Sequence, residues 1–365
     1  MTSLATATGA DGATGSVEAA ESEGVALPED LVPAGEAGAD WIEIPLAVDV
    51  SHHGFRLDRF LSSRFGRLSR SRIHKMIALG RVLDAASNRP WGKPASRVRT
   101  GDELLIVRPA PVEPAVVREY EELHRDSAFL VLNKPAGLPV HPSARYHRNT
   151  LTAVMRERMG AGHGWEMGHR LDRETSGVLV LAQRGEAARR LKHAFFRRRT
   201  DKEYLAVVHG ELTSTHRIEI PLGPARGSRI RIKVGERSLD DGGLSALTEV
   251  EPLQRGSFRG EPVTLVRARP KTGRTHQIRV HLALVGHAVV GDKVYGLDEQ
   301  RFLDVVEDGR PITELEAELG LSRHALHAHR LTLPHPASGE PVTFCAPWPD
   351  ELAQVLEFDP SRGSN

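Results

Sequence analysis

The feature that most constrains this chain is a polar, turn-like segment, HRLDRETSG at 169–177, which runs directly into the apolar stretch VLVLA at 178–182. Short apolar runs bounded by turn residues are typical of buried strands. The segment places one carboxylate, Asp172, between Arg170 and Arg173. Because opposite charge within a few ångströms favours the ionised form of a carboxyl group, we predict a charged, positioned Asp172 at the entrance to a buried strand. Such a carboxylate can act as a nucleophile or as a base.

The same segment has a simpler interpretation when it is taken alone. Aspartates paired with arginine are common on protein surfaces and mostly contribute little to stability. Asp172 would then be an inert ion-pair partner in a tight turn. The choice between the two interpretations depends on the residues found elsewhere in the chain.

The ends of the chain differ from its centre in composition. Residues 1–40 contain eight acidic side chains, no Lys or Arg, no aromatic residue and no periodic apolar pattern. This composition predicts a disordered acidic tail, and we predict a second disordered tail at 358–365. Residues 41–365 then carry 49 basic against 40 acidic side chains, a net charge of +9. A basic body favours a polyanionic partner such as RNA.

Several broad classes of protein are disfavoured. No apolar run approaches the roughly 18 residues of a membrane helix, and the N-terminus lacks the basic and apolar regions of a secretory signal. The single cysteine, Cys345, has no intramolecular disulfide partner, as is typical of a reducing compartment. We therefore predict a cytoplasmic protein that does not contact a membrane. Because nothing indicates an obligate protein partner, we expect a monomer.

Residues 41–109 are predicted to form a small, basic α+β domain. Apolar residues recur at helical spacing over 57–65, and residues 69–79 have the pattern of a second helix that begins at a capping serine. From residue 56 to residue 81 there are eight Lys or Arg residues and one acidic residue. This imbalance favours contacts with nucleic-acid phosphates, which helix N-terminal amides also attract. The predicted RNA-binding side chains are Arg56, Arg67, Arg70, Arg72 and Lys75.

These stretches resemble the small RNA-binding domain shared with a small-subunit ribosomal protein, the S-four type. The matching segments are RLDRFL at 56–61, SRSRIH at 69–74, LGRV at 79–82 and GDEL at 101–104. Members of that family usually continue from Gly-Arg-Val into a short hairpin. This chain has a longer stretch at 84–97, so we expect a remodelled loop.

The remainder of the chain is predicted to form a second, larger domain. A proline-rich stretch marks a stiff linker, which we place at 110–117. Strand-like apolar runs then outnumber long helical patterns and do not alternate with them regularly; the clearest runs lie at 128–132, 178–182, 204–208 and 263–269. This order predicts an α+β domain over 118–357 with a mixed, largely antiparallel sheet.

Six segments of this second domain, in this order, resemble the RluA-type pseudouridine synthases. Besides the Asp172 segment they are NKPAGLPVHP at 133–142, KEYLA at 202–206, KTGRTHQIRVH at 271–281, GDKVYG at 291–296 and LHA at 326–328. The resemblance extends from about residue 120 to residue 350, and the basic first domain fits those members that carry one. An acidic segment at 298–321 is additional to the family pattern.

The resemblance implies roles for individual residues. Asp172 matches the catalytic aspartate, and Arg279 matches the arginine that pairs with it. Tyr204 matches the tyrosine that packs on the target base, and Leu326 matches an apolar residue of the pocket wall. Arg170 matches the arginine with which family members help to open the RNA and fill the vacancy.

The reaction implied by the resemblance detaches uracil from ribose, turns it and rejoins it through carbon-5. It involves no redox change and implies no cofactor and no metal. Glycosidases use two carboxylates, whereas one suffices here because the detached uracil stays in the pocket. Stacking on Tyr204 would be worth about 1–3 kcal/mol, and extruding a base from a helix costs a few kcal/mol. Members with the first domain act mostly on large-subunit ribosomal RNA, which we expect ahead of transfer RNA.

Other functions can be compared with this one on the residues alone. A metal hydrolase is suggested by the 18 histidines, but no His-Glu-x-x-His pattern occurs. The sequence KTGR at 271–274 suggests a phosphate-binding loop, but the required motif Gly-x4-Gly-Lys-Ser/Thr is missing. A glycoside hydrolase would need a second acid, for which Glu174 and Glu203 are available. The main alternative is a non-catalytic RNA-binding protein of the same fold, which a substitution at the predicted catalytic positions would favour.

Overall fold

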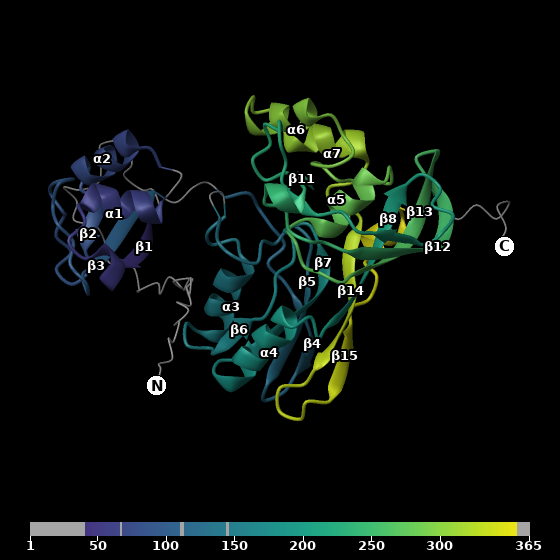
Figure 1. Ribbon diagram of the computed structural model, residues 1–365, viewed down its shortest axis with the longest axis horizontal. Helices are drawn as coiled ribbons and strands as arrows, with labels where there is room; N and C mark the ends of the chain where they lie inside the picture. Colours follow the sequence, from purple (N-terminus) through teal and green to yellow (C-terminus); the bar gives the residue numbers. More distant parts are fainter. Residues whose placement is uncertain (1–40, 66–67, 110–112, 144–145, 356–365) are drawn as a thin grey trace, which may run out of the picture. The chain divides into compact units, whose positions relative to one another are not determined.

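The computed structural model describes residues 41–65, 68–109, 113–143 and 146–355. The chain divides into two compact units that meet in sequence between residues 112 and 113 (Figure 1). Both predicted tails, at 1–40 and 358–365, lie outside the described residues. Residues 113–117, which the sequence assigned to a linker, are attached to the second unit. The Glu113 carboxylate accepts hydrogen bonds from the backbone amides of Arg148 and Asn149 at 2.8 and 2.7 Å.

The first unit is a small α+β domain. Its elements in chain order are β1 (Trp41–Ala47), the 3-10 helix η2 (Val50–His52), α1 (Leu57–Arg64), α2 (Arg70–Ala78), β2 (Val82–Asp84) and β3 (Glu103–Pro109). The strands form an antiparallel sheet in the spatial order β1-β3-β2. Both predicted helices are confirmed, and α2 begins where the Ser69 hydroxyl accepts a hydrogen bond from the Arg72 amide at 3.4 Å. Apolar residues of α1 and α2 share one core with the sheet.

The second unit is built around a sheet of ten strands. Eight of them lie in the spatial order β4 (Glu121–Arg125), β5 (Phe129–Lys134), β7 (Ser176–Gln183), β14 (Leu326–Pro334), β8 (Asp201–His209), β13 (Glu261–Pro270), β12 (Thr248–Phe258) and β9 (His216–Ile218). Strand β6 (Trp165–Met167) pairs with β7, and β15 (Pro341–Cys345) pairs with β14. Only β7 and β14 pair in parallel among these strands, so the predicted mixed, largely antiparallel α+β fold is confirmed.

The rest of the second unit consists of helices and a small hairpin. They are α3 (Leu151–Met159), α4 (Glu186–Phe196), the hairpin of β10 (Leu222–Pro224) and β11 (Val234–Glu236), η3 (Leu239–Asp241), α5 (Gln277–Leu284), α6 (Glu299–Val306), α7 (Ile312–Leu319) and α8 (Asp350–Ala353). The additional acidic segment forms α6 and α7, which lie near α5 and β11 (Figure 1). Within the described part of the chain, each helix is too short or too polar to cross a bilayer.

Strands β5 and β7 contain the continuous apolar runs 129–132 and 178–182, because both faces of these strands are covered there. On β5, Phe129 and Val131 pack in a core with residues of α4. Leu130 and Leu132, which point to the opposite face, pack in a second core with residues of α3. The continuous apolar runs at 128–132 and 178–182 are explained by this two-sided burial.

The parallel pairing of β7 and β14 places the Asp172 loop. Ser176 and Gly177 at the start of β7 lie opposite His327 and Ala328 of β14. Gly177 has a φ of +112°, and a β-carbon there would lie 2.2 Å from the Ala328 carbonyl oxygen. Only glycine therefore allows this close approach. The loop that precedes β7 is consequently brought beside the first residues of β14.

Candidate active site

Five side chains singled out in the sequence line one pocket of about 530 Å³. Asp172 and Arg170 come from the loop before β7, Tyr204 from the middle of β8, Arg279 from α5 and Leu326 from the first position of β14. Strands β8 and β14 are neighbours, which brings Tyr204 and Leu326 to one wall. Among the described residues that line this pocket, Asp172 is the only carboxylate.

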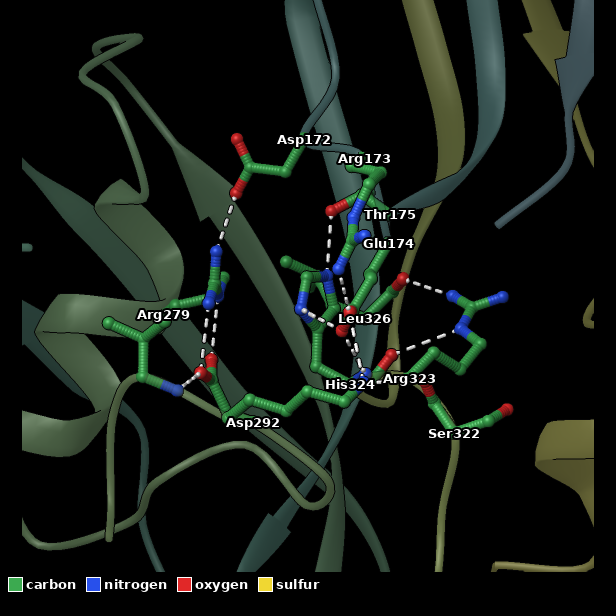
Figure 2. Close-up of polar contacts among 12 residues, drawn as sticks. Asp172, Arg173, Glu174, Thr175, Arg279, Asp292, Ser322, Arg323, His324 and Leu326 are labelled. Carbon is green, nitrogen blue, oxygen red and sulfur yellow. Dashed lines mark hydrogen bonds and ion pairs between the residues drawn. The ribbon is translucent and has the colours of Figure 1, made fainter. Parts of the chain in front are cut away.

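Arg279 joins Asp172 to a second carboxylate, Asp292 (Figure 2). Its Nη1 donates to Asp172 Oδ2 at 3.0 Å, while its Nε and Nη2 donate to Asp292 at 2.6 and 2.8 Å. The Asp292 side chain is fully buried and also accepts hydrogen bonds from the amides of Val294 and Tyr295. Asp172 is therefore held by a donor whose own position is fixed. Its other carboxylate oxygen points away from Arg279 (Figure 2).

Arg279 and Asp292 are both in their charged forms. Burial by itself would raise the pKa of Asp292, but the Arg279 charge and the hydrogen bonds outweigh it and lower that pKa. Burial would lower the pKa of Arg279, yet the two neighbouring carboxylates raise it above its ordinary value. Asp172 thus faces a permanent positive charge supplied by α5.

The prediction that the neighbouring arginines, Arg170 and Arg173, pair with Asp172 is wrong. Arg173 donates to the Tyr146 hydroxyl at 2.5 Å and to Glu174 at 2.7 Å, and Arg170 is exposed at the pocket wall. The chain turns here, since the Thr175 amide donates to the Asp172 carbonyl at 3.1 Å. Successive side chains in such a turn point to different sides. The charge that pairs with Asp172 comes instead from Arg279, 107 residues later in the chain.

Lys134 anchors the Asp172 loop from outside the pocket. Its ammonium group is fully buried and donates to the carbonyl oxygens of Pro135, Leu138 and Arg173 at 2.7, 2.9 and 3.0 Å. Burial lowers the pKa of Lys134 to about 7. The NKPAGLPVHP segment therefore supports the loop through this lysine, a role that the sequence did not predict.

Neither candidate for a second catalytic acid reaches the pocket. Glu174 accepts a hydrogen bond from Lys293 at 2.9 Å, and the same ammonium group donates to the Ser322 carbonyl at 2.5 Å (Figure 2). Glu203 pairs with two arginines of β13 at 3.3 and 3.2 Å. Asp172 is left without a carboxylate partner on the substrate side, which disfavours a two-carboxylate glycosidase.

Several basic side chains line the pocket. Lys202 donates to the Thr272 carbonyl at 2.7 Å, and burial, followed by the charge of Arg198, lowers the pKa of Lys202 to about 8. Lys271 and Arg274 also line the pocket. This arrangement suits an approaching phosphodiester chain.

The predicted RNA-binding residues of the first unit differ in their surroundings. Arg70, Arg72 and Lys75 are exposed on α2. Arg56 is exposed at the start of α1 and donates to both carboxylate oxygens of Asp58 at 3.1 and 2.8 Å. Arg67 lies outside the described residues. The contacts of these side chains with RNA stay a prediction.

The clustered histidines are engaged in ordinary hydrogen bonds. His324 bonds to Thr175 at 2.9 Å, His327 to Ser176 at 2.8 Å and His329 to the Ala346 carbonyl at 2.9 Å. Across the described residues, no group of three or more His, Cys, Asp or Glu side chains is arranged to hold a metal ion. These contacts give the histidines structural roles.

Buried histidines predict a stability that depends on pH. Burial lowers the pKa of His169 to about 3 and that of His327 to about 4. Each folded-state pKa lies below the unfolded value of about 6.5, so the unfolded chain binds protons first as the pH falls. Stability is therefore complete above about pH 6.5 and decreases toward pH 4, by up to about 1.4 kcal/mol per pH unit for each histidine.

Thermal unfolding at pH 7.5, 6.5 and 5.5 measures this loss. His169 Nε2 accepts a hydrogen bond from the Val180 amide at 3.0 Å. The His169→Gln variant keeps a hydrogen-bond acceptor but removes the titrating imidazole. We expect the unfolding midpoint of this variant to fall less steeply with pH than that of the wild type. Equal slopes would contradict the assignment to His169.

Tyr204 is an aromatic residue that lines the pocket. It is half-buried and packs between two apolar cores. Burial and then the charge of Asp172 raise its pKa, so the hydroxyl stays neutral. A ring in this setting can stack on a base, which is worth about 1–3 kcal/mol.

Replacing Tyr204 by Phe or Ala separates the ring from its hydroxyl. We expect Tyr204→Phe to retain kcat/KM within a few-fold, and Tyr204→Ala to lose about 10-fold to 100-fold because stacking is lost. Single-turnover rates on the same RNA measure both variants. Equal losses would show that the hydroxyl, and not the ring face, is required.

The chain is similar in sequence and fold to known proteins. A family model described as RNA pseudouridylate synthase matches residues 128–284. A Zymomonas mobilis protein named ribosomal large subunit pseudouridine synthase D is 34% identical over 319 residues, which cover 84% of this chain and 94% of the relative. A Xanthomonas campestris protein of the same name is 35% identical and covers 83% and 88%. The solved structure of human RNA Pseudouridylate Synthase Domain Containing 1 has a TM-score of 0.52 at 29% identity, over 69% of this chain and 95% of that one.

Proposed function

Because this chain belongs to the RluA-type RNA pseudouridine synthases, we propose that it converts uridine to pseudouridine in large-subunit ribosomal RNA with Asp172 as its catalytic carboxylate. The observation that carries this proposal is the single carboxylate in the pocket, which Arg279 and Asp292 hold in place. An isomerase of this kind needs one such group, and no second acid faces it.

The bonds that change explain why one carboxylate is enough. The bond between N1 of uracil and C1′ of ribose breaks, and a bond between C5 and C1′ forms. N1 gains a proton and C5 loses one, so no atom is added or removed overall. Asp172 acts as nucleophile or base, and the guanidinium of Arg279 holds it in position through a hydrogen bond. The uracil stays in the enclosed site until C5 faces the sugar.

The remaining pocket residues serve the target base. The base is extruded from its helix, which costs a few kcal/mol. It then lies between the ring of Tyr204 and the apolar wall at Leu326, both of which line the pocket. Arg170 occupies the vacancy in the RNA, a role supported by its exposure at the same pocket.

The substrate class follows from the relatives and from charge. The Zymomonas mobilis and Xanthomonas campestris relatives are named for the large ribosomal subunit. The basic side chains that line the pocket and the exposed basic residues of α2 suit folded RNA. We further propose that the protein acts in the cytoplasm as a monomer without a cofactor. A non-catalytic RNA-binding protein is less favoured because a carboxylate suited to catalysis lines the pocket and is held by Arg279.

Release of tritium from RNA labelled at C5 of uracil tests this proposal, since C5 must lose its hydrogen. We expect the wild-type protein to release tritium from ribosomal RNA and not from transfer RNA. Release from transfer RNA alone would contradict the substrate class. Binding of both RNA pools without release from either would favour the non-catalytic alternative.

A further inference from the structure

His276 lies in the pocket but has no role in the proposal above. It precedes α5, three residues before Arg279, and its side chain is 12% exposed. Its Nε2 lies 3.9 Å from Asp172 Oδ2, which is too long for a hydrogen bond. The edge of the imidazole therefore faces the region beside Asp172 where the target nucleotide must bind.

The contact with the Tyr295 hydroxyl favours one location for the ring proton of His276. The Tyr295 hydroxyl oxygen accepts a hydrogen bond from the Val234 amide at 2.9 Å and lies 2.9 Å from His276 Nδ1. The hydroxyl has one proton to donate, and Nδ1 is the acceptor beside it. If the Tyr295 hydroxyl donates to Nδ1, the Val234 amide, the hydroxyl and Nδ1 each have a hydrogen-bond partner, and Nε2 carries the ring proton.

The imidazole is neutral and firmly placed. Burial, followed by the charge of Arg279, lowers the pKa of His276. His276 also has a φ of +55°, a left-handed conformation that is uncommon outside glycine and is often found at functional sites. A neutral ring with a proton on Nε2 is a hydrogen-bond donor toward the pocket.

One segment positions both His276 and Arg279. Tyr295 packs its ring 5.1 Å from the Arg279 guanidinium carbon and donates its amide to Asp292 at 3.1 Å. Asp292 in turn binds Arg279. The GDKVYG segment thus holds the charge behind Asp172 and the donor beside it in a fixed relation.

We infer that His276 is a substrate-binding residue whose Nε2–H donates a hydrogen bond to an acceptor oxygen of the target nucleotide, and that Tyr295 is a positioning residue for it. The acceptor is a carbonyl oxygen of uracil or the ribose 2′-hydroxyl, the oxygens nearest the bond that Asp172 must reach. This inference rests on the proposed function and adds a second polar contact to the same site.

Replacing His276 by Phe or Gln tests the inference. His276→Phe keeps a ring without a donor, whereas His276→Gln keeps an N–H donor. Both place a side chain on the same left-handed backbone, so backbone strain is common to both. We expect His276→Phe to lower kcat/KM about 10-fold to 100-fold, the range for an unpaired polar group. His276→Gln should stay within about 5-fold of wild type, and Tyr295→Phe should fall between them.

The outcomes separate this inference from the proposed function. If the wild type is active and the His276→Phe variant is equally active, the inference about His276 is overturned, whereas the proposed function stands. A loss in His276→Gln as large as that in His276→Phe would reduce His276 to a structural role and would also overturn it. Absence of tritium release by the wild type would instead count against the proposed function.

A second measurement identifies the acceptor. The Asp172→Asn variant is expected to bind RNA without turnover and serves as the background. Its RNA affinity is measured with and without the additional change His276→Phe. Each protein is tested on RNA that carries uridine or 2′-deoxyuridine at the target position. An effect of His276→Phe that disappears on the 2′-deoxy RNA assigns the 2′-hydroxyl. An effect that persists assigns a uracil carbonyl. No effect on either RNA would contradict a contact in the bound state.

Discussion

Replacing Asp172 by asparagine is expected to lower the single-turnover rate about 1000-fold or more, while RNA affinity changes by only a few-fold. The asparagine side chain has the same size and keeps an oxygen for the Arg279 hydrogen bond, but it is neither a nucleophile nor a base. A positioned acid or base alone is typically worth about 100-fold to 10000-fold. Tritium release under single-turnover conditions, together with an RNA dissociation constant, measures both parts of this expectation.

The matched control is Asp201→Asn, on strand β8. Asp201 is exposed and does not line the pocket, so this variant should keep wild-type rates. Near-normal turnover by Asp172→Asn would show that the catalytic carboxylate has been wrongly assigned. A large loss of RNA affinity in the same variant would point to a role in binding instead.

Replacing Asp292 by alanine is expected to reduce both stability and activity. The change removes both acceptors for the Arg279 Nε and Nη2 groups and leaves a buried guanidinium with only Asp172 to neutralise it. Breaking a buried ion pair in this way destabilises a protein by about 3–5 kcal/mol. Arg279 also loses the orientation that presents Nη1 to Asp172. Denaturant unfolding and the single-turnover rate measure the two effects.

A double variant distinguishes the two causes. Arg279→Met combined with Asp292→Leu replaces the pair by apolar side chains of similar volume, which is often neutral for stability. We expect this variant to recover most of the stability that Asp292→Ala loses, yet to remain inactive because Asp172 has no cationic partner. Recovery of activity along with stability would contradict the role of Arg279. Unchanged stability in Asp292→Ala would contradict the buried charge pair.

Much of the fold could be predicted because local patterns match the burial that the structure provides. The apolar runs at 128–132 and 178–182 are strands covered on both faces, and periodic apolar residues in the first unit form α1 and α2. Boundaries were less predictable. The basic, amphipathic pattern at 186–199 predicts a helix over that whole range. Helix α4 nevertheless ends at Phe196, because Arg198 adopts a left-handed φ of +55°.

The members of the candidate site, and the pairing of Arg279 with Asp172, could be predicted from the resemblance, but not from the residues next to Asp172. Asp172, Tyr204, Arg279 and Leu326 line one pocket, as the resemblance implied. The arginines next to Asp172 suggested the wrong partner, since sequence proximity does not show where a side chain points within a turn. The supporting residues Lys134, Asp292 and Tyr295 lie in recognised segments, yet their roles depend on carbonyl, amide and ring contacts that only the folded chain creates.

Direct detection of the product tests the central claim most directly. An unmodified transcript of large-subunit ribosomal RNA would be incubated with the wild-type protein or with Asp172→Asn, digested to nucleosides and separated by liquid chromatography with mass detection. We predict a new nucleoside with the mass of uridine and the retention of pseudouridine in the wild-type reaction, and none with Asp172→Asn. Equal amounts of pseudouridine with both proteins, or a product of different mass, would contradict isomerisation by Asp172.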